Sequence, residues 1–98
     1  MKNILTNINK AFESRIRLGI MSVLVVHKSM DFIGLREILE VTDGNLASHL
    51  RALEDCGYIS SEKRFINRKP NTTYTITDEG SESFRSHIKA LEDLLSRQ

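Results

Sequence analysis

Apolar residues recur at two different periods along this chain, and the two periods predict a mixed architecture. Near the start, apolar residues from Phe12 to Leu24 follow the helical period, which predicts a long helix over about residues 11–28. Near the end, apolar residues at 84, 88, 91 and 95 are spaced by four, three and four. This spacing predicts a second long helix over about 78–96.

Two shorter helices are predicted between these ends. Residues 31–34 resemble a brief extended segment, and the apolar residues that follow give a short helix ending near Val41. The next helix covers about 42–56 and begins after only a tight turn. Its buried side is predicted by three leucines at helical spacing: Leu46, Leu50 and Leu53. Two helices joined this closely, over about 35–56, are typical of a helix-turn-helix.

The outer face of this third predicted helix is small and polar. Thr42 is expected to cap its start, and Gly57 is expected to close its end in the left-handed conformation. The residues opposite the leucines are Gly44, Asn45, Ser48, Arg51 and Ala52, with His49 at the border. Such a face suits a DNA major groove, where Asn and Ser side chains contact base edges.

The polar residues of this helix are therefore candidates for DNA binding. Asn45 and Ser48 are expected to contact bases, and Arg51 to reach a base or a phosphate. His49 is expected either to donate to a phosphate or to pack at the helix edge. Thr42 is expected to be a cap at a helix start that also presents donors to a phosphate.

The period changes to two after Gly57. Residues 58–66 alternate, and residues 72–77 are rich in β-branched side chains, so two strands are predicted. The intervening residues 67–71 contain the only proline of the chain and have the composition of a turn. The resulting hairpin, over about 58–77, has a basic tip. Its four cations are expected to contact phosphates or the minor groove: Lys63, Arg64, Arg68 and Lys69.

Composition fits a single domain over residues 1–98, and charge is informative only through its distribution. The 98 residues carry a formal net charge of +1, which by itself does not indicate a nucleic-acid-binding protein. Residues 1–30 and 58–77 are basic, whereas residues 31–57 and 78–98 are acidic. A local basic region still allows phosphate binding, but the acidic second segment counts against purely electrostatic binding.

Cysteine and histidine usage gives no indication of a metal site. Cys56, the only cysteine, excludes an internal disulfide and a multi-thiolate zinc site. Next to Gly57 it is expected to be a small packed residue, with a redox switch as the alternative. His27, His49 and His87 lie far apart, and no carboxylate–histidine cluster has ligand spacing, so no metal or other cofactor is expected.

The sequence also lacks the signals of an enzyme or of a membrane protein. We find no nucleophile–base pairing, glycine-rich phosphate loop or pair of carboxylates, and an enzyme is not expected. The first ten residues lack the features of a signal peptide, and the apolar residues 19–26 are too few to span a bilayer. We therefore expect a cytoplasmic protein without a membrane partner.

The order of these segments resembles the winged-helix DNA-binding proteins, in particular the small single-domain transcriptional regulators of the ArsR/MarR-like group. The resemblance covers about residues 12–95. It is carried by Phe12–Leu24, Leu35–Leu39, Val41–Asn45, Lys63–Phe65, Pro70–Thr77 and Gly80. In the ArsR relatives a serine usually follows the first leucine of the third helix, whereas here that position is Ala47 and the serine is Ser48.

This resemblance implies an α+β, mainly helical fold: a winged helix-turn-helix with a β-hairpin wing and a C-terminal dimerisation helix. It also implies a transcriptional regulator that binds double-stranded DNA at a pseudo-palindromic operator as a homodimer. The regulator is expected to be a repressor. The alternative is a winged-helix module for protein–protein contact without sequence-specific DNA binding. The sequence names neither the operator nor a small-molecule effector.

The ends of the chain are expected to form the dimer interface. Residues 2–10 add a short helix or an arm with apolar positions, and the final helix carries a long apolar stripe. The expected interface residues are Ile4, Leu5, Ile8, Phe84, Ile88, Leu91 and Leu95. In the alternative, the final helix folds back on the core of its own chain.

Overall fold

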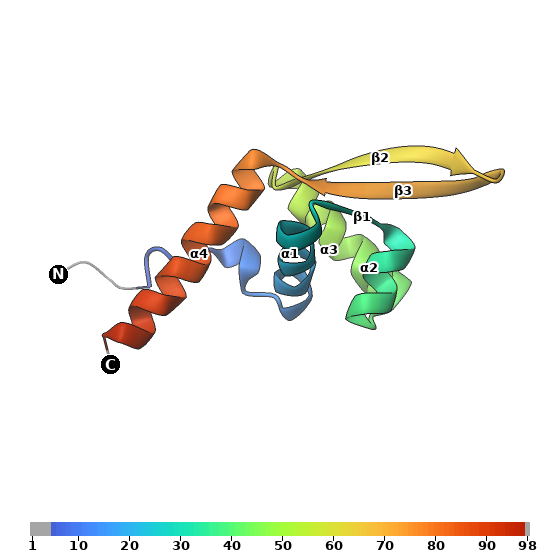
Figure 1. Ribbon diagram of the computed structural model, residues 1–98. Helices are drawn as coiled ribbons and strands as arrows, with labels where there is room; N and C mark the ends of the chain where they lie inside the picture. Colours follow the sequence, from blue (N-terminus) through green and yellow to red (C-terminus); the bar gives the residue numbers. More distant parts are fainter. Residues whose placement is uncertain (1–4, 98) are drawn as a thin grey trace.

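Each α-helix begins at a side chain that caps its first turn. The computed structural model describes residues 5–97 and has the arrangement of a winged helix (Figure 1). Ser14 precedes α1 (Arg15–His27), Asp31 precedes α2 (Phe32–Leu39), Thr42 precedes α3 (Asp43–Asp55) and Thr77 precedes α4 (Asp78–Ser96). In every case the side-chain oxygen accepts a hydrogen bond from the backbone N–H three residues later, which satisfies a donor that the helix leaves unpaired.

Two predicted boundaries in the first half of the chain were wrong. The first helix does not start at residue 11: Lys10–Phe12 form a separate 3-10 turn, η1, and α1 begins only after Ser14. The extended segment predicted at residues 31–34 lies earlier, because β1 is Ser29–Asp31 and the next residues already belong to α2. The reason is the cap at Asp31, which starts the helix at Phe32, three residues before its first fully buried side chain, Leu35.

The wing is a long antiparallel hairpin. β2 (Ile59–Ile66) and β3 (Lys69–Ile76) pair along their whole length, and β1 adds to the base of β3, giving the strand order β1-β3-β2. The turn consists only of Asn67 and Arg68, whose φ angles of 52° and 65° are those of the tight turns that favour hairpins. The predicted turn over residues 67–71 was therefore too long, because residues 69–71 belong to β3.

Pro70 fits inside a strand because of its register. It lies opposite Phe65, one step after the pair Ile66–Lys69 that closes the turn. Paired residues alternate between hydrogen-bonded and non-hydrogen-bonded positions, so the proline nitrogen faces away from β2. On that side β3 is an open edge, because β1 reaches only Thr73. The missing N–H therefore costs no ladder hydrogen bond.

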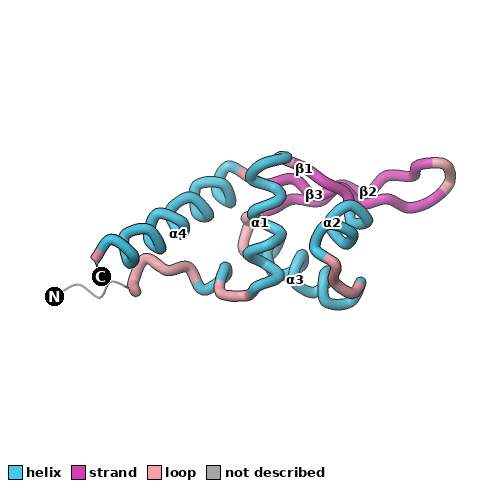
Figure 2. Tube along the Cα trace, turned by 60° about the horizontal axis from the view of Figure 1, so that its bottom comes forward, coloured by secondary structure: helices cyan, strands magenta, loops and turns pink. Residues whose placement is uncertain are grey.

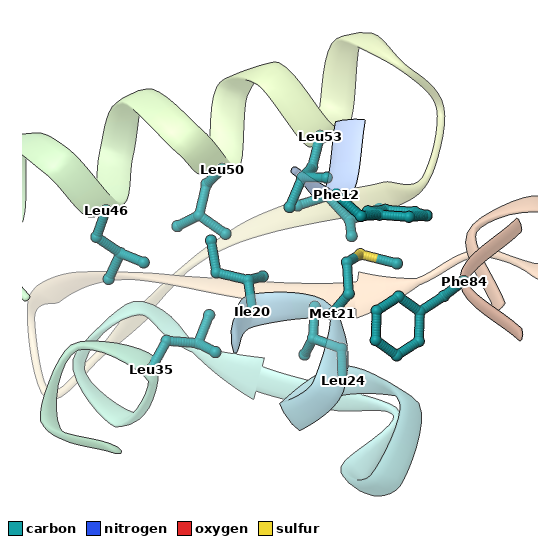
Figure 3. Packing of buried hydrophobic residues seen from close by; sticks show 10 residues of the cluster. Phe12, Ile20, Met21, Leu24, Leu35, Leu46, Leu50, Leu53 and Phe84 are labelled. Carbon is teal, nitrogen blue, oxygen red and sulfur yellow. The ribbon is translucent and has the colours of Figure 1, made fainter. Parts of the chain in front are cut away.

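The core lies where α1, α2 and α3 meet beneath the base of the sheet. Figure 3 shows the three leucines of α3 pointing toward α1 and toward Leu35 of α2. The fully buried side chains are Phe12, Ile20, Met21, Leu24, Leu35, Leu46, Leu50, Leu53 and Ile59. The predicted leucine stripe of the third helix is thus confirmed, and the opposite face of α3 is exposed to solvent.

The wing and α4 project from this core in different directions. The molecule measures 57 × 25 × 21 Å along its principal axes, and both views show α4 leading away from the helix-turn-helix (Figures 1 and 2). The N-terminal segment lies along α4, where the Asn9 N–H donates to His87 Nδ1 at 3.1 Å. Phe12 packs edge-on against Phe84 and His87, with ring centroids 5.3 Å apart in both pairs.

A candidate nucleic-acid interface

The outer face of α3 is exposed and small. Gly44, Asn45, Ala47, Ser48 and Arg51 are all exposed, whereas the three leucines on the other side are buried. A shallow hollow on this face is lined by Ala47, Ser48 and Arg51. The structure therefore brings the predicted base-contacting side chains together on one accessible surface. Ala52 differs from the prediction, because it is only half-exposed at the margin of this face.

Acidic side chains surround this face, but two of them are engaged. Asp43 forms an ion pair with Arg36 of α2, with Nη1 and Oδ1 3.0 Å apart. Glu54 accepts a hydrogen bond from Ser61 Oγ of β2 at 2.9 Å. Burial, and after it the charge of Glu54, raises the pKa of Tyr74. Asp55 is exposed at the last turn of α3. A phosphate is therefore better tolerated near the N-terminal half of α3 than near Asp55.

Thr42 and His49 border the exposed face in different ways. Thr42 caps α3 as predicted, and its hydroxyl oxygen lies 3.3 Å from the backbone nitrogen of Asn45. His49 is half-buried, and its Nδ1 lies 3.4 Å from Arg17 Nη1. Because a guanidinium only donates, Nδ1 accepts and the proton of the neutral ring is on Nε2. The Nε2–H therefore remains available as a donor.

Arg17 is a residue whose role the sequence pattern did not reveal. Its Nε donates to the carbonyl oxygen of Ala11 at 2.7 Å, while its Nη1 reaches His49. One guanidinium thus links η1, α1 and α3 near the recognition surface. The only sequence signal was a basic residue inside an apolar helical period, which does not identify partners 6 and 32 positions away.

The four basic residues of the wing are exposed, but they differ in their partners. Arg64 Nε donates to Glu62 Oε1 at 2.7 Å, and this hydrogen bond lowers the pKa of Glu62 and raises that of Arg64. Arg68 occupies the turn, and Lys69 begins β3. With Glu62 held by Arg64, the free positive charge of the wing is concentrated at Lys63, Arg68 and Lys69.

A carboxylate connects the wing to the helix-turn-helix. Asp31 Oδ1 accepts from the Gly34 N–H at 2.8 Å, and its Oδ2 accepts from Asn71 Nδ2 at 3.1 Å. The same side chain therefore caps α2 and fixes β3, 40 residues later in the sequence. This link orients the wing relative to α2 and α3, and neither residue was singled out by the sequence pattern.

Cys56 corrects a prediction. It was expected to be packed, but the structure leaves it exposed at the C-cap of α3. The apolar stripe of α3 ends at Leu53, and the chain turns away from the core at Gly57, whose φ is 79°. The left-handed conformation predicted for Gly57 at the end of the helix is thus confirmed. This turn leaves the thiol of Cys56 exposed to solvent.

The residues predicted for a dimer interface differ in how far they are exposed. Ile88, Leu91 and Leu95 are 36%, 37% and 76% exposed along α4, and Leu5 is 60% exposed. Ile8 is half-buried, and Ile4 lies outside the described residues. Phe84 does not belong to this surface, because it is only 6% exposed and packs in the core of its own chain. The alternative of a helix folded back on its own core therefore holds for the first part of α4.

Two other features of the described residues bear on function. No group of three or more His, Cys, Asp or Glu side chains among residues 5–97 is arranged to hold a metal ion. Within the same part of the chain, no helix is long and apolar enough to cross a membrane.

Comparison with known proteins gives the same architecture. The profile of a family described as winged helix DNA-binding domain matches residues 16–95. An uncharacterized protein of Methanocaldococcus jannaschii is 37% identical over 79 residues, which span 81% of this chain and 86% of that protein. The structure of a transcriptional regulator homologue protein from Pyrococcus horikoshii OT3 superimposes with a TM-score of 0.84 at 31% identity, covering 95% of this chain and 90% of that chain.

A more distant likeness concerns a structure that contains DNA. Reduced AbfR bound to DNA superimposes with a TM-score of 0.76 at 14% identity, covering 92% of this chain and 64% of that chain. At this identity the likeness shows the fold alone. The profile match and the 31% identical structure go further, and they show that this chain belongs to the winged helix DNA-binding domain family, with the fold of winged-helix transcriptional regulators.

Proposed function

We propose that this protein is a sequence-specific DNA-binding transcriptional regulator that acts as a repressor. The observation that supports the proposal most directly is the exposed face of α3, where Asn45, Ser48 and Arg51 stand beside small residues. A helix of this kind can approach the floor of the major groove, because few bulky groups hold it away. In this proposal Asn45 and Ser48 contact base edges, and Arg51 reaches a base or a phosphate.

The surroundings of α3 are assigned to the phosphate backbone. In this proposal the backbone N–H groups at the N-terminus of α3, near Thr42, and the Nε2–H of His49 donate to phosphates. The helix dipole also favours negative charge at the N-terminus of α3. Lys63, Arg64, Arg68 and Lys69 of the wing contact the adjacent backbone and minor groove. These contacts set position and affinity, whereas the α3 contacts set sequence preference.

We further propose that the DNA-bound form is a homodimer. One copy of α3 offers few base contacts, and a two-fold axis would present two copies to two halves of a pseudo-palindrome. The exposed stripe Ile88, Leu91 and Leu95, continued by a groove between α1 and α4 lined by Val25 and Ile88, supports this assignment. Leu5 and Ile8 of the N-terminal segment extend the proposed interface.

Selection of binding sites from a random duplex library tests the proposed function. We expect a pseudo-palindromic sequence to be enriched, and binding to it to weaken steeply as salt rises. The double variant Arg68→Ala, Lys69→Ala should flatten the slope of log K against log salt by about one unit for each lost phosphate contact. No preference for the selected duplex over random DNA would refute the proposal.

A protein-binding module is the second candidate, and acidic residues favour it. Glu54 and the exposed Asp55 lie at the end of α3 that faces the wing base. Such a module would bind duplex DNA weakly and without preference. The selection experiment separates the two functions, because only the regulator enriches one sequence.

A further inference from the structure

The tip of the wing exposes large apolar side chains. Phe65 is 79% exposed and Ile66 is 53% exposed, although both lie in a strand far from any core of the described chain. Phe65 stands directly opposite Pro70 on the neighbouring strand, so the two form an apolar pair next to the turn. Phe65 and Pro70 together form an exposed apolar surface at the end of a projecting hairpin, where a partner can cover it.

The pair lies on the face of the hairpin that, at the base of the wing, is turned toward α3. Alternate residues of a strand share one face, so Phe65 lies on the same side as Ser61 and the buried Ile59. Ser61 donates to Glu54 of α3, which shows where that face is directed. Phe65 is four residues further along, about 13 Å beyond Ser61 at roughly 3.3 Å per residue. Ile66 lies on the opposite face.

The charges around the tip indicate what kind of partner covers Phe65. Lys63, Arg68 and Lys69 are exposed nearby, whereas the only acidic residue of the hairpin, Glu62, is held by Arg64. A matching surface must therefore combine negative charge with an apolar slot. The minor groove of duplex DNA has both, because phosphates line its edges and sugars and base steps form its interior.

We propose that Phe65, supported by Pro70, is an apolar wedge that the wing inserts against a base step of the minor groove. Arg68 and Lys69 hold the phosphates on either side of the inserted ring. The wedge rests on the proposed DNA-binding function and deepens it. Because pyrimidine–purine steps unstack and kink most easily, the wedge selects such a step under the wing, at a position that α3 does not read.

The variant Phe65→Ala tests the wedge, and Ile66→Ala is its matched control. Both remove an exposed apolar side chain from the wing tip, but only the first removes it from the face that carries Ser61 and Pro70. For Phe65→Ala we expect about a tenfold weaker affinity for the selected duplex, as for loss of an aromatic contact with a base. The salt slope should stay unchanged, because no phosphate contact is lost. Ile66→Ala should bind like the unmodified protein.

Two further readouts separate the wedge from a merely structural role. Fluorescence energy transfer between the ends of the duplex should report a kink that is lost with Phe65→Ala and kept with Ile66→Ala. Repeating the site selection with Phe65→Ala should lose the enriched pyrimidine–purine step and keep the bases under α3. Thermal unfolding of both variants should match that of the unmodified protein, since both side chains are exposed.

The results also distinguish the wedge from the function on which it rests. If the unmodified protein prefers its selected duplex and Phe65→Ala binds, kinks and selects as it does, the wedge is refuted and the regulator stands. An equal loss with Ile66→Ala likewise refutes it, because the effect would not depend on the face. If the unmodified protein prefers no duplex, both proposals fail together.

Discussion

Single residues at the end of α3 fix how the wing and α4 leave the core. Gly57 reverses the chain with a φ of 79°. Thr77 Oγ1 then donates to the Gly57 carbonyl at 2.7 Å and accepts from the Gly80 N–H at 3.0 Å. The backbone N–H of Thr77 also donates to the Tyr58 carbonyl at 3.0 Å. The start of α4 is thus locked to the turn that follows α3.

Gly80 is required at this junction because no side chain fits. A Cβ at this position would collide with the carbonyl oxygen of Tyr58. We expect Gly80→Ala to lower the free energy of unfolding by about 1–3 kcal/mol, as for overpacking of a tight core. Gly44→Ala is the control: a Cβ there meets nothing within 4 Å, so stability should stay unchanged or rise by up to about 1 kcal/mol. Urea unfolding measures both, and equal stabilities would contradict the close contact.

Two polar residues on α3 are expected to determine sequence preference. Asn45→Ala or Ser48→Ala should change the preference between the selected duplex and one altered at the matching base by about 1–3 kcal/mol. The salt slope should change little, because base contacts release few counterions. Competition titrations with the two duplexes measure the effect. Ser22→Ala, an exposed serine on α1, is the control and should keep the preference.

At the scale of elements, polar contacts between distant segments set the geometry of the interface. Asp31 ties β3 to the start of α2, Ser61 ties β2 to α3, and Arg17 ties α1 to α3. A long two-stranded hairpin without such links would be free to twist relative to the recognition helix. These contacts explain how the wing can act at a fixed distance from α3.

The N-terminal segment is attached to α4 through a buried histidine, and this attachment is expected to depend on pH. Burial lowers the pKa of His87 below its ordinary value of 6.5, against the opposing charge of Glu13. Only the neutral ring can accept the Asn9 N–H at Nδ1. The unfolded chain therefore binds a proton more readily than the folded one, and stability rises with pH in this window. The contribution is present above about pH 6.5 and is lost as pH falls through the folded pKa of His87.

Unfolding in urea at a series of pH values between neutral and acidic measures this dependence. His87→Gln should flatten it, because glutamine can accept the same hydrogen bond but does not titrate. The exposed His27 provides the control, and His27→Gln should keep the dependence of the unmodified protein. A pH dependence that survives in His87→Gln would show that another group is responsible.

At the scale of the whole molecule, the two projecting parts have different proposed roles: the wing binds DNA and α4 forms the dimer. The wing carries exposed positive charge away from the core, and the second half of α4 carries exposed apolar side chains. The elongated shape, 57 Å in its longest extent, separates the two surfaces. A dimer formed through α4 would leave both wings available to DNA.

Removing the apolar stripe should separate the two copies. We expect Leu91→Ser, Leu95→Ser to sediment as a monomer, to bind the selected duplex far more weakly and to keep most of its helical signal, because neither side chain is in the core. Ile38→Ser removes an exposed apolar side chain from α2 instead and should remain a dimer. Sedimentation of the unmodified protein as a monomer at concentrations on the order of tens of micromolar would refute the dimer.

The sequence by itself determined the parts of this protein that depend on neighbours a few residues apart. The leucine stripe of α3, its cap at Thr42, the left-handed Gly57 and the two strands of the wing all follow from local spacing and backbone preference. Short turns and element boundaries did not follow from local spacing, because Asp31 and the pair Asn67–Arg68 fit more than one local conformation.

Only the tertiary structure decided which side chains meet across the fold. It placed Phe84 in the core, exposed Cys56, paired Arg17 with His49 and joined Asp31 to Asn71. It also left Phe65 uncovered at the wing tip. An apolar or charged residue has the same local pattern whether it packs, pairs or stays exposed. Whether such a residue is buried, paired or exposed depends on the elements that pack against it. The arrangement of those elements depends on contacts between distant parts of the chain.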